Sequence, residues 1–499
     1  MNPARCRVFK FEKNTMITIK NISKNILGET LFEGASFTIH KNDKIGVVGP
    51  NGSGKSTLIK IILGEVEADS GSINIDNERV GYLSQELPFQ DGDTIESILN
   101  KNLDKKKAIL EKVGLLGLPD DFPAKQLSGG QKTRLAIAKI LIDKPTMLIL
   151  DEPTNHLDTK GLEWLEDFIH EFRGGVLIVS HDRRLLDNAV NKVLEIDPVN
   201  HKFVEYIGGY TAYAMEKEKQ LIRWEDDYRL QQNEKRRMEL WLALKKQEAS
   251  LHADPAKGRL IRAMEKRLQR DIYDQEIPRP RSQKKLGEIE LKGEVASSKL
   301  IMRASSISKA FQNKVVLKNV NFEMRGKEHV LLAGENGSGK TTLLKVLTGD
   351  VKPDSGEIKI GENVQFGYFA QEHEILNKNK TVMEEFVATE RLLPSAKNPR
   401  AILGSFLFSG QNVFKKVSSL SLGERVRLIF AKLTNQENEF LILDEPTNHL
   451  DIQSREVIED ALLSYQGAIL VVSHDRYFLD KILINRMLIL QGGNVGATN

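Results

Sequence analysis

The sequence predicts an α/β fold, with two domains of similar size joined by a long α-helical hairpin. Three observations support this fold class. One set of motifs occurs twice in the same order, short apolar runs alternate with helical patterns in each copy, and a charged segment with helical spacing separates the copies. A repeat of this length indicates a duplicated domain and not a solenoid.

The duplicated motifs keep an almost constant spacing. GPNGSGKS at 49–56 recurs as GENGSGKT at 334–341, so Lys340 lies 285 positions after Lys55. The runs LILDEP and SHDR each recur 293 positions later. Both copies therefore carry the same chemical groups in the same order.

Length and composition narrow the class of protein. The 499 residues suffice for two domains of roughly 200 residues, each with its own core. Cys6 is the one cysteine, which excludes an internal disulfide framework and a cysteine-rich metal site. No run approaches the roughly 18 to 20 apolar residues of a membrane span. We therefore expect a cytoplasmic protein without membrane insertion.

The domain boundaries follow from changes in sequence character. The first residues lack the apolar core of a secretory signal, and a strand-like alternation begins at Met16. We interpret the segment before it as a disordered tail or a mis-assigned start. The predicted divisions are a tail at 1–15, a first domain at 16–209, a linker at 210–299, a second domain at 300–493 and a short tail at 494–499.

The linker sequence predicts a helical hairpin with a basic surface. Its apolar residues fall at helical spacing on both sides of a turn at 252–258, where Asp254-Pro255 favours a helix start. A first arm of roughly 40 residues at about 1.5 Å each would be about 60 Å long. Between Arg229 and Lys285 there are 16 Lys and Arg against 8 Asp and Glu, whereas the whole chain carries a net charge of only +3. Positive charge is therefore concentrated in the linker.

Each glycine-rich motif predicts a phosphate-binding loop between a strand and a helix. Its glycines let backbone N–H groups surround phosphates, its lysine adds a positive charge, and its hydroxyl group ligates magnesium. Two such loops, each after an apolar run and before a helical pattern, argue against a chance match. The predicted binding residues are Gly49, Asn51, Gly52, Gly54, Lys55, Ser56 and Thr57 in the first copy and Gly334, Asn336, Gly337, Gly339, Lys340, Thr341 and Thr342 in the second.

A pair of carboxylates follows an apolar run in each copy. Asp151 and Asp444 each end such a run, at the strand end where a magnesium-binding aspartate belongs. Glu152 and Glu445 come next and are predicted to be catalytic, as general bases that polarise an attacking water. Asp-Glu-Pro could instead be a simple strand terminator, but the paired phosphate loops disfavour this interpretation.

A histidine and a glutamine complete each predicted site. His181 and His474 follow apolar runs and are predicted to act in catalysis as γ-phosphate sensors, although a lone histidine in this position is more often structural. Gln85 and Gln371 fit a loop that reports the nucleotide to the rest of the domain. The predicted magnesium ligands are Ser56, Gln85 and Asp151 in one copy and Thr341, Gln371 and Asp444 in the other.

With LSGGQ at 127–131, the order of motifs resembles that of the ATP-binding cassette superfamily. The serine and glycines open a helix whose N-terminus suits a γ-phosphate. The resemblance covers nearly the whole chain and implies two cassettes arranged head to tail within a monomer, with ATP and Mg²⁺ as ligands. It also implies that each nucleotide contacts the signature motif of the opposite cassette, through Ser128, Gly130 and Gln131 or through Ser421 and Gly423.

Some positions depart from the superfamily pattern. In the second signature motif, LSLGE at 420–424, Leu422 replaces a glycine and Glu424 replaces a glutamine. Phe311 fits the aromatic residue that binds adenine by stacking, but the matching stretch 25–28 of the first copy contains no aromatic residue. We therefore expect weaker adenine stacking in the first site and unequal turnover at the two sites.

Three interpretations of the biological role compete. The first is a soluble ATPase subunit of an exporter that works with a separate membrane permease, for which the charged linker has no evident use. The second is a repair or ribosome-recycling member of the superfamily. These members carry zinc modules, coiled coils inserted within a cassette or iron–sulfur clusters, against which the single cysteine and the position of the linker argue.

The third interpretation is the ABC-F group, which the sequence resembles in having DEPTNHLD at 151–158 and again at 444–451 and a basic hairpin between the cassettes. This resemblance implies ATP-dependent binding at the ribosomal exit site, with the hairpin directed toward the P-site tRNA and the peptidyl-transferase centre. Members act as translation factors or protect ribosomes from antibiotics, and the short bend favours a translation factor.

RNA phosphates are expected to contact the basic residues near the bend. The alternative is a solvated helix face whose charges only maintain solubility. The predicted RNA-binding residues are Lys257, Arg259, Arg262, Lys266, Arg267 and Arg270.

Overall fold

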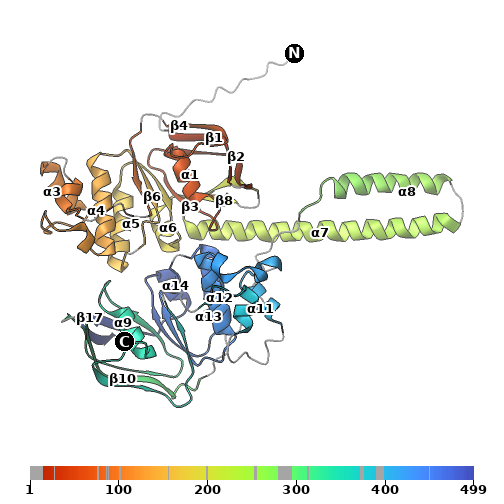
Figure 1. Cartoon of the computed structure of the whole chain (residues 1–499). Coiled ribbons are helices and arrows are strands. Elements are labelled where there is room, and N and C mark those ends of the chain that lie inside the picture. Colours follow the sequence, from red (N-terminus) through yellow and green to blue (C-terminus); the bar gives the residue numbers. More distant parts are fainter. Residues whose placement is uncertain are drawn as a thin grey trace. The chain divides into compact units, whose positions relative to one another are not determined.

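The computed structural model divides the chain into two compact units, Met1–Tyr210 with Glu288–Asn499, and Thr211–Gly287. The first unit holds both α/β domains and the second holds most of the linker. Residues 1–14 of the predicted tail at 1–15 and Gln371 lie outside the described residues, and Thr15 belongs to the first strand and not to a tail. The structure describes residues 15–26, 28–75, 78–85, 87, 89–90, 92–99, 103–155, 157–197, 200–251, 255–278, 295–311, 314–370, 376–388, 398–408, 410–448 and 450–498 (Figure 1).

Two sheets form the first domain. The larger has the order β5 (Val80–Leu83), β6 (Met147–Asp151), β7 (Gly175–Val179), β3 (Lys44–Val48), β8 (Lys192–Asp197) and β9 (Lys202–Ile207). Its strands are parallel except for β9. The smaller sheet is antiparallel, with the order β2 (Glu29–His40), β1 (Thr15–Ile26) and β4 (Ser70–Ile75). Every residue of β3, β6 and β7 is buried, as expected for parallel strands covered on both faces.

Helix α1 (Lys55–Ile62) shares one apolar core with both sheets. Ile17 and Phe37 come from the small sheet, Ile149 and Val179 from the large sheet, and Leu58 from α1. The helix therefore begins at the phosphate-loop lysine and is held in place by both sheets. The other helices of this domain are α2 (Ile95–Leu99), α3 (Leu103–Lys112), α4 (Gly129–Ile142), α5 (Thr159–Glu171) and α6 (Arg183–Ala189).

The second domain repeats this plan. Its large sheet has the order β14 (Phe366–Phe369), β15 (Phe440–Asp444), β16 (Ala468–Val472), β12 (His329–Ala333), β17 (Arg486–Gln491) and β18 (Asn494–Thr498). Its small sheet has the order β11 (Lys314–Arg325), β10 (Leu300–Phe311) and β13 (Ser355–Ile360). Its helices are α9 (Lys340–Thr348), α10 (Val382–Val387), α11 (Pro399–Ser405), α12 (Leu422–Thr434), α13 (Ile452–Leu463) and α14 (Arg476–Lys481).

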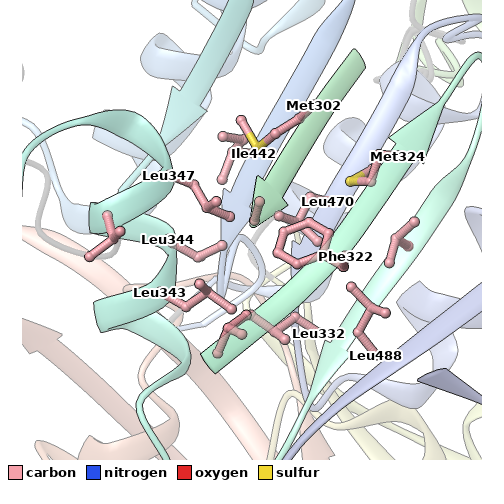
Figure 2. Packing of buried hydrophobic residues seen from close by; sticks show 14 of the residues in the cluster. Met302, Phe322, Met324, Leu332, Leu343, Leu344, Leu347, Ile442, Leu470 and Leu488 are labelled. Atoms are coloured by element: carbon pink, nitrogen blue, oxygen red, sulfur yellow. The ribbon is translucent and has the colours of Figure 1, made fainter. Parts of the chain in front are cut away.

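Figure 2 shows the core of the second domain at the place that corresponds to the core around α1. Leu343 and Leu347 of α9 pack against Phe322 of the small sheet and against Ile442 and Leu470 of the large sheet. Both phosphate-loop helices are thus anchored by the same arrangement of apolar side chains.

The segment after Gly493, expected to be a short tail, forms the edge strand β18 in the structure. It pairs antiparallel with β17, as β9 pairs with β8 in the first domain. Little in the sequence indicates this strand, because among its described side chains only Val495 packs against the core. Edge strands carry a weak apolar signal because only one face is covered.

The linker forms the predicted helical hairpin. Helix α7 (Tyr210–Leu251) has 42 residues, α8 (Pro255–Leu268) starts at the predicted proline, and a π-helical turn, η2 (Gln269–Tyr273), follows (Figure 1). Polar contacts confirm that the arms are antiparallel, because Trp224 Nε1 donates to the carbonyl of Pro278 at 3.1 Å and Lys246 pairs with Glu265 at 2.6 Å. No helix in the described part of the chain is long and apolar enough to cross a membrane.

The apolar stripe predicted from helical spacing holds the two arms together. Four side chains are buried between them and three are partly buried. These are Met238, Leu242, Leu268 and Ile272, flanked by Trp241, Ile261 and Met264. The hairpin therefore has a small core of its own.

Two reciprocal arginine–glutamate pairs join the two α/β domains. Arg183 Nη1 donates to both carboxylate oxygens of Glu459, at 2.9 and 3.1 Å. Arg476 Nη2 donates to one carboxylate oxygen of Glu166, Oε1. Each residue lies 293 positions from its counterpart, so the SHDR arginine of either domain pairs with the other domain, as in an isologous interface.

The Glu459 carboxylate is completely buried and also accepts a hydrogen bond from Lys481 at 3.1 Å. Glu459→Ala should lower the free energy of unfolding by about 3–5 kcal/mol, because it removes the bidentate carboxylate partner of the buried Arg183 and leaves it with Glu456 at 3.9 Å. Urea-induced unfolding measures this. Asp460→Ala is the matched control, because Asp460 also pairs with Lys481 but is 52% exposed, so its loss should cost less than about 1 kcal/mol. Equal losses for the two variants would contradict the assignment of the buried pair.

Candidate active site

The phosphate-binding loops have the predicted strand–loop–helix geometry. Gly54 precedes α1 with φ +98°, and a Cβ there would lie 3.0 Å from the Phe32 ring, so glycine is required by both conformation and space. Lys55 Nζ donates to the carbonyls of Gly49 and Pro50 at 2.7 and 3.0 Å. Lys340 makes the same two contacts in the second loop. Each lysine is therefore fixed beside the helix N–H groups that suit a phosphate.

The strand-end aspartates fit a magnesium ion. Burial raises the pKa of Asp151 and of Asp444, while the adjacent lysine and the loop hydroxyl, Ser56 or Thr341, lower it. Both carboxylate oxygens of Asp444 are buried without a hydrogen-bond partner in the described part of the chain. No group of three or more His, Cys, Asp or Glu side chains among the described residues could hold a metal. A buried carboxylate beside a hydroxyl suits Mg²⁺, which proteins hold by one or two carboxylates together with water and substrate phosphates.

Glu152 and Glu445 have left-handed backbones, with φ of +49° and +48°. This conformation is rare for residues with a side chain and is held here by a hydrogen bond from each glutamate N–H to the neighbouring strand, at 2.8 Å. Burial raises the pKa of Glu152 to about 7 and that of Glu445 to about 8. Both groups are thus poised to exchange a proton near neutral pH.

The histidines lie beside these glutamates. His181 Nε2 is 3.5 Å from Glu152 Oε1, and His474 Nε2 is 3.6 Å from Glu445 Oε1. Burial lowers the pKa of His181 well below its usual value and that of His474 to about 4. The imidazoles are therefore neutral at pH 7, and each can offer a hydrogen bond without carrying a charge.

The two signature helices begin with the same capping box. Ser128 accepts from the backbone N–H of Gln131 at 3.3 Å, and Gln131 Oε1 accepts from the N–H of Ser128 at 2.9 Å. Ser421 and Glu424 make the same pair of bonds at 3.2 and 2.8 Å. The exchange of glutamine for glutamate thus preserves the cap, which is the function that both side chains perform in this structure.

Most of the predicted site residues line one of two cavities. The first, of about 750 Å³, contains residues of the first domain together with Leu422 and Arg455 of the second. The predicted residues that line it are Asn51, Gly52, Gly54, Lys55, Ser56, Thr57, Gln85, Asp151, Glu152 and His181. Gly49, Ser421 and Gly423 are not among its lining residues, although Leu422 brings the opposite signature motif to its wall.

The second cavity, of about 560 Å³, has the reciprocal composition. Gly129 of the first signature motif reaches its wall, whereas Ser128, Gly130 and Gln131 do not line it. The predicted residues that line it are Asn336, Gly337, Gly339, Lys340, Thr341, Thr342, Asp444, Glu445 and His474. The lining residues thus follow the head-to-tail arrangement that the resemblance implied.

The positions that we predict for base stacking carry different residues in the two copies. Phe311 ends β10 and Ile26 ends the corresponding strand β1. Phe311 is 47% exposed, with Lys309 Nζ 5.4 Å from its ring centre, and it does not line the second cavity. Ile26 lines the first cavity, so an aliphatic side chain takes the aromatic position there.

Further site residues were not predicted from the sequence. The Asp451 carboxylate accepts from the backbone N–H of Asn51 at 3.1 Å and also caps α13 through Ser454. The repeated DEPTNHLD motif, which ends at Asp451, contained the signal for this residue. Arg455 lines both cavities but is absent from the repeat, so the motif comparison gave no signal for it.

The site and the fold together define a tandem P-loop protein of the ATP-binding cassette class. The chain belongs to the ABC transporter family, whose pattern matches residues 32–155 and 317–448. Among its relatives are tandem cassette proteins of the ABC-F and Uup type, in agreement with the resemblance seen in the motifs.

Three curated relatives match along most of their lengths. The putative ATP-binding protein YdiF of Bacillus subtilis is 35% identical, with 96% of this chain and 80% of the relative covered. The ABC transporter F family member 5 of Arabidopsis thaliana is 32% identical, with 96% and 75% covered. The ATP-binding protein Uup of Escherichia coli is 31% identical, with 93% and 79% covered.

Solved structures share the fold. The archaeal ribosome recycling factor aABCE1, in its complex with the ribosomal stalk protein aP1, has a TM-score of 0.64 at 19% identity, with 95% of this chain and 89% of that chain covered. The RNase-L inhibitor has a TM-score of 0.62 at 20% identity, with 96% and 90% covered. At this level of identity the likeness concerns the fold alone.

The left-handed backbone at Glu152 predicts that the usual order of stability of alanine and glycine variants is reversed at this position. Glu152→Gly should be more stable than Glu152→Ala by about 1 kcal/mol, because glycine adopts positive φ without steric cost. At the exposed helical position Glu163 the order should reverse by a similar amount. Chemical denaturation of the four variants tests both. The same order at both positions would contradict the left-handed assignment.

Proposed function

We propose that both sites bind ATP with Mg²⁺ and hydrolyse it to ADP and phosphate. The observation that carries this proposal is the pairing, in each cavity, of a buried glutamate with a neutral histidine, 3.5 Å away in the first site and 3.6 Å away in the second, next to a phosphate-loop lysine. These are the groups that phosphoryl transfer to water requires.

Each group in the proposed site has a separate role. Mg²⁺ would be held by Asp151 and Ser56, or by Asp444 and Thr341, and would supply positive charge to the phosphate oxygens. The loop amides and Lys55 bind the phosphates. Glu152 orients the attacking water and accepts its proton, while the neutral His181 donates a hydrogen bond toward the γ-phosphate. Glu445 and His474 have the same roles in the second site.

We further propose that the ATP-bound form binds the ribosome at its exit site and acts through the linker on the P-site tRNA or the peptidyl-transferase region. This would make the protein a cytoplasmic translation factor or a factor that protects ribosomes from antibiotics. Membership of the ABC-F type supports the proposal, as does the chemistry of the hairpin surface.

The basic side chains near the bend are available to a polyanion. Arg259, Arg262 and Lys266 are exposed and make no ion pair with another described residue. Arg267 and Arg270 are also exposed and share Asp271, so that pair retains net positive charge. Contacts to RNA phosphates would be independent of sequence and sensitive to salt. For Lys257, the structure describes the backbone in α8 and not the side chain.

The exporter interpretation makes a different prediction. An exporter ATPase works with a permease, so the protein would sediment with membranes and its hairpin charges would not affect ribosomes. Membrane pelleting and ribosome co-sedimentation of the same lysate separate the two proposals.

The double variant Glu152→Gln with Glu445→Gln should bind ATP but not hydrolyse it, because the amide cannot accept a proton from water. It should therefore remain on ribosomes when ATP is present, whereas the unmodified protein should dissociate as hydrolysis proceeds. Sucrose-gradient sedimentation with ATP, with ADP and without nucleotide measures this. If the double variant sediments free of ribosomes with ATP, the ribosome proposal fails.

Reversal of three unpaired charges tests the hairpin. In the double variant, Arg259→Glu with Arg262→Glu and Lys266→Glu should weaken ribosome binding by about tenfold or more near 100 mM salt, and should flatten the salt dependence. The matched control reverses the exposed Lys314, Lys318 and Lys352 of the second domain, with the same change in net charge. Equal losses in both triple variants would show that the effect is one of total charge and not of the hairpin surface.

A further inference from the structure

Arg455 lies on α13, one turn after Asp451, and three hydrogen bonds fix its guanidinium group. Nη1 donates to the backbone carbonyl of His181 at 2.9 Å and to Asp475 Oδ2 at 3.0 Å. Nε donates to the carbonyl of Leu450 at 3.1 Å. The side chain is 13% exposed. A planar guanidinium with three separate acceptors is held in one orientation.

Through its bond to the His181 carbonyl, Arg455 of the second domain contacts the backbone of a residue of the first site. The His181 imidazole is 3.5 Å from the Glu152 carboxylate, and Arg455 lines the first cavity together with both. A donor that fixes the His181 carbonyl also fixes the backbone from which that imidazole projects. Arg455 therefore acts on the first site through the position of His181.

In the second site Arg455 contacts a neighbour of the histidine and not the histidine itself. Its acceptor there is the Asp475 side chain, which follows His474 and lines the second cavity. Asp475 is already held as the cap of α14, where it accepts from the N–H of Phe478 at 3.0 Å. The second site therefore depends less on Arg455 than the first site does.

The duplication supplies no counterpart of Arg455 for the second site. The residue 293 positions earlier is Leu162. The alignment is secure because Glu163, Glu166 and Asp167 match Glu456, Glu459 and Asp460 at the same spacing. Leu162 is buried and lines the second cavity, but leucine has no hydrogen-bond donor in its side chain.

We propose that Arg455 is a positioning residue that the second domain supplies to the first ATP site, and that the first domain supplies no equivalent to the second site. Turnover at the first site then depends on the placement of α13, whereas turnover at the second site does not depend on α5 in the same way. The proposal rests on the ATP hydrolysis proposed above.

The expected kinetic effect is on turnover and not on nucleotide affinity. The Lys55 ammonium and the loop amides are the groups placed to bind the phosphates, and Arg455 contacts none of them in the described structure. A displacement of about 1 Å in a catalytic group can reduce the rate by about 100-fold. Loss of Arg455 should therefore lower kcat and leave KM for ATP nearly unchanged.

The experiment measures each site in isolation. Glu445→Gln leaves the first site with its base, and Glu152→Gln leaves the second. Adding Arg455→Leu, which introduces the residue type found at 162, should lower kcat of the first site by about tenfold or more and change KM by less than about threefold. The same substitution should lower kcat of the second site by less than about threefold.

Three comparisons separate positioning from general stability. Arg455→Lys keeps the charge and can satisfy part of the hydrogen bonding, so it should restore part of the turnover at the first site. Arg486→Leu removes an arginine of the second domain that pairs with Glu328 at 3.1 Å and lines neither cavity, so the ratio of the two kcat values should not change. Amide hydrogen exchange around His181 should be faster in Arg455→Leu, and that around His474 should change less.

Equal losses at the two sites, an increase in KM with kcat unchanged, or unaltered exchange around His181 would each overturn the proposal. The exchange measurement decides the question if either single-site variant is inactive by itself. If Arg455→Leu does not fold, Arg455→Gln takes its place with the same expected order. An unmodified chain that hydrolyses no ATP would instead overturn the proposed function, so the two failures are distinguishable.

Discussion

The carboxyl edge of each parallel sheet is the constraint on which both sites depend. Strands β3, β6 and β7 are neighbours, run in the same direction and are buried along their whole lengths. Polar groups that must reach ATP can therefore emerge only where these strands end. This brings Lys55, Asp151 and His181 to one cavity although they are distant in the sequence. The second sheet repeats the constraint, and its site forms at the same edge.

The pairing of the two domains uses residues that adjoin the catalytic ones. In SHDR, the histidine faces the glutamate of its own site, while the arginine two positions later forms a buried pair with the other domain. Tyr210, the first residue of α7, packs its ring against Arg183, with 5.6 Å from the guanidinium carbon to the ring centre, and its hydroxyl bonds Glu456 at 3.3 Å. The N-terminus of α6 therefore adjoins His181 of the first site, the Arg183–Glu459 pair and Tyr210 at the start of the linker helix. A shift of α13 relative to α6 would therefore change the contacts of all three.

The sequence was sufficient for the α/β class, the hairpin and most residues of the two cavities, because these depend on local motifs and on helical spacing. The motif predicts the position of Gln131, but it does not predict that this side chain closes a capping box. The left-handed backbone of Glu152 could not be predicted, because glutamate has no preference for it and tertiary hydrogen bonding imposes it. Strand β18 was missed because, among the side chains of this strand that the structure describes, only Val495 packs against the core. Arg455 was missed because a comparison of repeats finds what the copies share, and this residue is one that they do not share.

The differences between the copies concentrate on the first site. Ile26 stands where the second domain has Phe311, so the aromatic surface that we predict for base stacking is absent from the first domain at this position. Leu422 places a side chain at the wall of this cavity, whereas Gly129 has none at the corresponding wall of the second. Both Leu422 and Arg455 come from the second domain, and their counterparts in the second cavity, Gly129 and Leu162, are residues of a different type. The unequal turnover that we propose would then arise from these differences, without any change in the Glu–His pair that both sites retain.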